Sequence, residues 1–120
     1  MTLADMVAQA EFLFVGDDEF AISEEVWERV AGTDRIGEVL DALIPHLEAC
    51  EWSAEAVGEM RAVMLDLGMS KTQMNKKTMP ALYAVVEGRP SGLPLFASIV
   101  LLGRAPTLAR LRAARERLTG

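Results

Sequence analysis

The sequence predicts an all-α protein, a bundle or cage of about six to seven helices. Of its 120 residues 51% are hydrophobic but only 6% are aromatic, and an apolar set rich in Met, Leu and Ala favours helices over strands. Apolar residues recur at helical spacing through most of the chain, and no segment of useful length alternates as a half-buried strand does. Glycine and proline separate these segments, at positions typical of helix ends.

The first two helices are expected over residues 2–14 and 24–30. In both segments, apolar side chains recur three and four residues apart. Gly16 follows the first helix and Gly32 the second, where glycine commonly ends a helix. Ser23 is the expected N-cap of the second helix, and the acidic residues after it lie where the helix dipole favours negative charge.

The third helix has the strongest periodic signal, and Thr33 is its expected N-cap. Its apolar stripe consists of Ile36, Val39, Leu40, Leu43, Ile44 and Leu47. Pro45 falls late in this stripe, where a proline is expected to kink the helix. A fourth helix is expected after Ser53, with an apolar inner face and with Gly68 at its end.

Three further helices are expected after a polar, irregular loop over residues 69–79. They cover residues 81–87, 94–102 and 107–118. Pro80 begins the first of them, because a first-turn residue needs no N–H. The turn-rich segment 88–94 separates the first two, and Gly103 separates the last two.

Charge is distributed unevenly along the chain, whose formal net charge is −6. Residues 1–60 hold 15 acidic and 2 basic residues, a net of −13, whereas residues 61–120 hold 3 acidic and 10 basic residues, a net of +7. We expect one helical domain over residues 1–120, divided into an acidic lobe (1–68) and a basic lobe (69–120). The basic lobe suits a polyanion, since surface charges act within about 10 Å at physiological salt. Alternatively, the two sets of charges neutralise each other, within one molecule or between copies.

Common catalytic and metal-binding arrangements are missing from the sequence. Cys50 is the only cysteine and His46 the only histidine, which excludes an internal disulfide and a multi-cysteine metal site. A single histidine leaves no plausible Ser/His/Asp set either. We therefore expect no catalysis, no metal and no cofactor. The most apolar run, Leu93 to Leu102, is too short to span a bilayer, and no secretory signal is visible, so a cytoplasmic location is expected.

Cations of the second half form the candidate binding site for a polyanion. The candidate phosphate-binding residues are Lys71, Lys76, Lys77, Arg89 and Arg104. Each can neutralise a phosphate, which gives salt-dependent affinity with little sequence content. Tyr83 lies among them and can stack an unpaired base if it is exposed. The alternatives are a core tyrosine with a bonded hydroxyl and a merely solubilising lysine loop. A solvated helix face is expected for Arg110, Arg112, Arg115 and Arg117.

Four segments of the second half carry motifs in a distinctive order. They are Lys77–Arg89, Gly92–Phe96, Leu102–Arg104 and Leu108–Leu111. Upstream, Glu51–Ala56 contains a Trp-Ser-x-Glu helix start, and Phe12–Val15 forms an aromatic helix end. Together these motifs resemble the C-terminal, all-helical, anticodon-binding part of bacterial glutamyl-tRNA synthetases, over essentially the whole chain. The synthetase's catalytic half has no counterpart in the sequence.

The resemblance implies binding of a tRNA anticodon loop, with tRNA-Glu as the expected partner. In that family a loop before Leu-Phe holds a base through backbone contacts, which implies this role for Gly92, Leu93, Pro94 and Leu95. The base-reading arginine of the family corresponds to Tyr83, its threonine to Glu87 and its glycine to Lys76. These departures imply that anticodon discrimination is altered or lost.

Two functional hypotheses follow from the sequence. The first is a non-catalytic tRNA-binding module of the glutamyl-tRNA synthetase type. The second is a free-standing relative that has lost RNA readout and binds a protein partner, through its acidic N-terminal half. Neither hypothesis involves a membrane.

Overall fold

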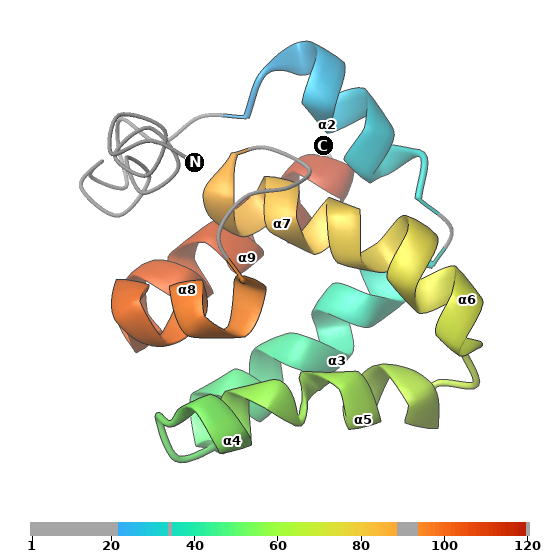
Figure 1. The fold of residues 1–120 in the computed structure, drawn as a ribbon. Coiled ribbons are helices and arrows are strands. Elements are labelled where there is room, and N and C mark those ends of the chain that lie inside the picture. Colours follow the sequence, from blue (N-terminus) through green and yellow to red (C-terminus); the bar gives the residue numbers. More distant parts are fainter. Residues whose placement is uncertain (1–21, 34, 89–93, 120) are drawn as a thin grey trace, which may run out of the picture.

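The computed structural model describes residues 22–33, 35–88 and 94–119, which form a helical fold (Figure 1). In chain order the elements are α2 (Glu24–Ala31), α3 (Ile36–Ala49), α4 (Ala54–Gly58), α5 (Met60–Asp66), α6 (Lys71–Gln73), the π-helix η2 (Met74–Thr78), α7 (Met79–Glu87), α8 (Leu95–Leu102) and α9 (Arg104–Thr119). No strand occurs in these three stretches, so the all-α prediction is confirmed. The helix expected over residues 2–14 lies outside the described residues.

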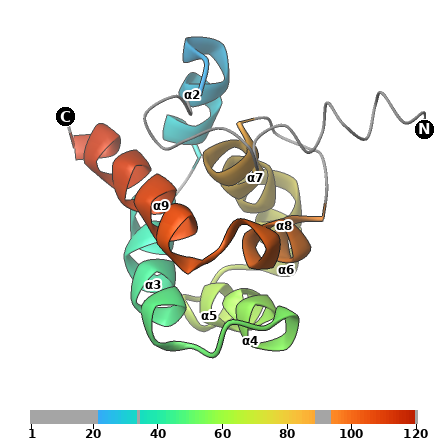
Figure 2. The same ribbon diagram turned by 90° about the vertical axis from the view of Figure 1, so that its left-hand side faces the viewer.

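Helices distant in sequence pack side by side around one core. The long helices α3 and α9 lie against each other, α2 lies on α7, and α4 lies on α8 (Figures 1 and 2). The stripe on α3 is fully buried at Leu40, Leu43 and Leu47, and each such leucine contributes about 1.5–3 kcal/mol of burial free energy. Each of these helix pairs joins the two halves of the chain. The division into an acidic and a basic lobe stays a prediction. In this fold that prediction concerns the distribution of charge on the surface.

Helix caps follow the sequence at two places and depart from it at a third. Ser23 Oγ accepts a hydrogen bond from Val26 N (3.3 Å), and Ser53 Oγ accepts one from Ala56 N (3.2 Å), as expected. The expectation that Thr33 caps the third helix is wrong. Its hydroxyl donates to a carbonyl at the end of α2, and Arg35 is the residue before α3.

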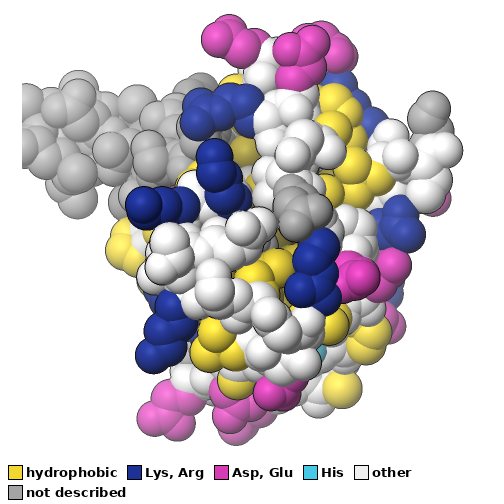
Figure 3. Space-filling model, turned by 90° about the vertical axis from the view of Figure 1, so that its right-hand side faces the viewer, with side chains coloured by type: hydrophobic (Ala, Val, Ile, Leu, Met, Phe, Trp, Pro, Cys, Tyr) yellow, Lys and Arg dark blue, Asp and Glu magenta, His cyan; other side chains and the backbone are white. Residues whose placement is uncertain are grey.

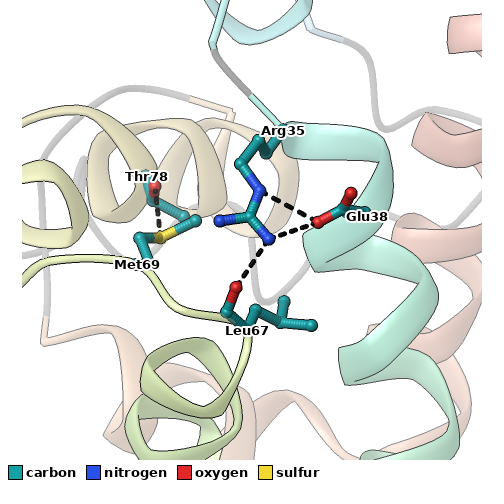
Figure 4. Close-up of polar contacts among 5 residues, drawn as sticks. All are labelled: Arg35, Glu38, Leu67, Met69 and Thr78. Carbon is teal, nitrogen blue, oxygen red and sulfur yellow. Dashed lines mark hydrogen bonds and ion pairs between the residues drawn. The ribbon is translucent and has the colours of Figure 1, made fainter.

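The turn between α2 and α3 is held by Arg35, whose φ of 62° lies in the left-handed region. Such a conformation is unfavourable for a residue with a side chain. Its guanidinium donates to Glu38 Oε2 (2.9 and 2.6 Å) and to the carbonyl of Leu67 (2.6 Å), as Figure 4 shows. Nearby, the buried Thr78 hydroxyl donates to Met69 Sδ (3.3 Å). The bonds of Arg35 thus join the start of α3 to the end of α5. The bond of Thr78 joins the turn after α5 to η2.

The segment expected as an irregular loop over residues 69–79 is helical from Lys71 onward. α6, η2 and α7 follow one another without a break from Lys71 to Glu87. Met74 and Thr78 are buried one turn apart, so this segment does have an inward face. Pro80 lies in the first turn of α7, as expected, and its missing N–H disturbs the regular ladder where the wider π turn occurs.

Two other boundaries differ from expectation. The fourth predicted helix is divided at Glu59 into α4 and α5. The last helix begins at Arg104 rather than after Pro106, directly after Gly103, whose φ of 99° suits glycine alone. No helix of the described ranges combines the length and apolar character that crossing a bilayer requires.

Candidate nucleic-acid interface

A cleft of about 460 Å³ opens between α2 and the helix that runs from α6 into α7. Its cationic lining residues are Arg29, Lys76 and Lys77. Arg29 comes from the last turn of α2, and the two lysines come from η2 on the facing wall. Among the described residues that line the cleft none is acidic. The cleft therefore presents positive charge from both of its walls.

The floor of the cleft is apolar because α2 and α7 pack there. Val30 on α2 and Ala81 and Ala84 on α7 are buried and line the hollow. The small alanine side chains leave space that a larger residue would fill. Gln73 and Thr33 add polar groups at the edge. The cleft thus combines a cationic rim with an apolar floor.

Figure 3 shows the side of the molecule on which α6 lies. Lysine and arginine side chains spread over the middle of this face, whereas acidic side chains lie mainly at its upper and lower ends and at its right-hand edge. Lys71, Lys76 and Lys77 are all exposed. Within the described parts of the chain, none of the three forms an ion pair. The structure therefore places the predicted lysines on one helix, with Lys71 just outside the cleft lining.

The arginines of α9 are used within the molecule. Arg112 pairs with Glu48 (3.1 Å), Arg115 with Asp41 (2.8 Å) and Arg117 with Glu24 (2.8 Å). The hydrogen bond from Arg115 lowers the pKa of Asp41 and raises that of Arg115 itself. Acidic side chains of the first half thus neutralise part of the basic charge of the second half, as the alternative interpretation of the charge pattern expects.

Arg110 does not lie on a solvated face, so that expectation is wrong. Its side chain is buried, and Nη1 donates to the carbonyl of Val86 (2.6 Å). Glu87, next along α7, is also buried, so this carboxylate is not displayed to solvent.

Arg104 fastens the start of α9 to the turn between α3 and α4. It donates a hydrogen bond to the carbonyl of Cys50, and its guanidinium carbon lies 5.2 Å from the Trp52 ring centroid. Arg104 does not line the cleft. Its role in RNA binding stays a prediction.

Tyr83 is half-buried against the core, and its hydroxyl accepts a hydrogen bond from Leu95 N (3.1 Å). This bond satisfies one of the free N–H groups at the start of α8. The geometry is that of a core tyrosine with a bonded hydroxyl, the alternative to base stacking. Leu95 is buried and Pro94 is exposed. Arg89, Gly92 and Leu93 lie outside the described residues, so base binding by this loop stays a prediction.

Arg29 is a cleft residue that the sequence interpretation missed. It belongs to the acidic half, and only the packing of α2 on α7 brings it opposite the lysines. Its position in the last turn of an amphipathic helix was the available signal, but that position does not identify the facing helix.

Comparison with known proteins agrees with this architecture. The family model described as the anticodon binding domain matches residues 1–115. The chain is 41% identical over 118 residues to a glutamate–tRNA ligase of Salinispora arenicola (strain CNS-205), covering 97% of this chain and 24% of that protein. It is 35% identical over 118 residues to the glutamate–tRNA ligase of Frankia casuarinae, covering 98% and 24%.

The chain therefore spans about a quarter of the length of these relatives. No solved structure gave a significant match. The family match extends over nearly the whole sequence and agrees with the all-helical structure. The resemblance drawn from the sequence motifs is thus confirmed, and this chain belongs to the anticodon binding domain family.

Proposed function

We propose that this chain is a tRNA-binding module that contacts the anticodon loop and serves glutamyl-tRNA aminoacylation without carrying out catalysis itself. The supporting observation is the cationic cleft and the row of exposed lysines beside it, in a member of the anticodon binding domain family. The relatives are named glutamate–tRNA ligases, which supports tRNA-Glu as the partner.

The physical basis of binding is charge on one face. Lys71, Lys76 and Lys77 hold their ammonium groups in solvent and free of described ion pairs, so they can exchange water and counterions for phosphate oxygens. Each phosphate that is neutralised releases condensed counterions, and the logarithm of affinity falls by about 0.7–0.9 per tenfold rise in salt. The net charge of −6 does not prevent this, because screening makes the attraction local.

Replacement of the three lysines tests the proposal. The variant Lys71→Gln/Lys76→Gln/Lys77→Gln should bind tRNA-Glu more weakly at 0.1 M salt and show a salt slope smaller by about 2–3. Fluorescence anisotropy of labelled tRNA across a salt series measures both quantities.

The matched control is Arg112→Gln, which also removes positive charge from the surface. Its guanidinium already pairs with Glu48, so the slope should stay at the native value. Absence of tRNA binding by the native chain at low salt, or a slope insensitive to the lysines, would contradict the proposal.

The second hypothesis, a protein partner for the acidic half, receives less support. Glu24, Asp41 and Glu48 of that half are engaged by arginines of α9. These ion pairs leave fewer acidic side chains for a partner. A complex from cell extract that survives nuclease treatment, formed by a chain that does not bind tRNA, would restore this hypothesis.

A further inference from the structure

The cleft beside the lysines holds more space than binding of a phosphate backbone requires. Phosphate contacts need only exposed cations, as at Lys71, and no hollow. The volume of about 460 Å³ lies within the range of about 300–1,000 Å³ in which small organic groups are held. Its half-buried apolar residues, Val26 and Pro80, offer contact to a flat ring rather than to an anion. The lining therefore suits a ligand with both a ring and a negative charge.

The C-terminal end of α2 lines the cleft, and backbone carbonyls at this end are hydrogen-bonded within the protein. A helix C-terminus carries partial negative charge, which repels an anion. Here Gly32 N donates to the carbonyl of Glu28 (3.0 Å), and Thr33 Oγ1 donates to the carbonyl of Arg29 (2.8 Å). These bonds occupy carbonyl oxygens at that end. The Arg29 side chain, which forms no ion pair with any described residue, is left to supply positive charge.

We propose that the cleft takes one unpaired nucleotide of the bound RNA. Its base lies against Val26 and Pro80, and its phosphate lies among Arg29, Lys76 and Lys77. This inference rests on the proposed tRNA-binding function and adds a site for a single nucleotide. Unpaired bases of RNA are splayed out and stacked on aromatic side chains or on arginine guanidinium planes. In the described lining Arg29 provides such a plane together with positive charge.

A nucleotide within a chain fits better than a free one. The cations continue past the cleft to Lys71 along the same helix, where the next phosphates of a strand would lie. A free mononucleotide has no phosphate for that position. The RNA backbone therefore contributes to binding through a contact beyond the hollow, at Lys71.

Two variants test the cleft itself. Arg29→Gln removes one cation from an exposed side chain and should weaken tRNA-Glu binding roughly fivefold to tenfold. Val26→Phe extends a half-buried, cleft-lining residue into the hollow and should exclude the base. Arg29→Lys keeps the charge and should recover part of the affinity, and Arg112→Gln serves as the control. Thermal unfolding shows that each variant is folded.

Chemical probing of the unpaired tRNA nucleotides provides the second readout. The native chain should protect one unpaired nucleotide that becomes reactive again with Val26→Phe and with Arg29→Gln, while protection of the neighbouring backbone persists. Binding without any nucleotide that depends on these two residues would overturn the cleft site and leave the proposed function intact. Absence of tRNA binding by the native chain would instead remove the proposed function.

Two further results would also overturn the cleft site. Tight binding of AMP or UMP alone, abolished by Arg29→Gln, would make the cleft a site for a free nucleotide. Binding of polyglutamate with the same dependence on Arg29 and Val26 would make it a site for an acidic protein. Only weak, salt-sensitive binding of these probes agrees with a nucleotide held as part of an RNA chain.

Discussion

At the scale of single residues, many polar side chains of this fold bind the backbone of another element. His46 Nε2 donates to the carbonyl of Ala56 (2.9 Å), Trp52 Nε1 to that of Val100 (3.2 Å), and Arg110 to that of Val86. Each bond satisfies a backbone carbonyl and links two different elements or turns of the fold. The lone histidine is thus placed to hold α4 against α3.

Tyr83 permits a test at this scale that separates stability from RNA binding. Tyr83→Phe removes the hydroxyl that accepts from Leu95 N and should lower the free energy of unfolding by about 0.5–1.5 kcal/mol. Because the ring is kept, tRNA affinity should not change. Urea unfolding and anisotropy measure the two effects. A loss of affinity without a loss of stability would show that the hydroxyl serves the ligand rather than α8.

At the scale of elements, the sequence predicts helices well where the apolar repeat is long. The stripe of α3 identifies that helix, and Pro45 lies within it without ending it. The helix from Lys71 to Glu87 is harder to predict, because three lysines and a proline hide the short inward face at Met74 and Thr78. Local cap chemistry also misleads at Thr33, since the same hydroxyl can serve the preceding helix.

Some residues of the candidate site can be predicted from local sequence, and others depend on how the helices pack. Lys71, Lys76 and Lys77 lie close together in the sequence, so their charge is visible without a structure. Arg29 enters the site through the packing of α2 on α7, a contact between segments about 50 residues apart that no local pattern encodes. The ion pairs of the α9 arginines depend on packing as well, because α3 carries Asp41 and Glu48 and packs against α9.

The Arg115–Asp41 pair gives an element-scale prediction, since it joins α9 to α3. Asp41 has a lowered pKa, so the pair stabilises the fold above the ordinary pKa of the carboxyl and loses this effect as the pH falls through the lowered value. Arg115→Gln should return the pKa of Asp41 toward its ordinary value and weaken the acid dependence of stability. An NMR titration of the Asp41 carboxyl measures the shift, and Arg112→Gln should leave it in place.

At the scale of the whole molecule, one core joins the acidic and basic halves. Leu43→Ala removes a fully buried side chain of α3 and should cost about 2–5 kcal/mol of unfolding free energy. Because α3 packs on both α5 and α9, both halves should unfold together. Urea unfolding followed by tryptophan fluorescence and by far-ultraviolet circular dichroism should give coincident transitions. Two separate midpoints would show that residues 1–68 and 69–120 fold as independent lobes.

Arg35 has a consequence for the energetics of association. Its guanidinium links the entrance of α3 to the carbonyl of Leu67, and Thr78 Oγ1 meets Met69 directly beyond it. Through residues 67–69 these contacts connect the start of α3, which follows α2 in the chain, with η2, which carries Lys76. Rigidity of this kind spares a receptor the entropic penalty of organising itself during complex formation. Under the proposed function, the loss of freedom on docking would fall mainly on the RNA strand.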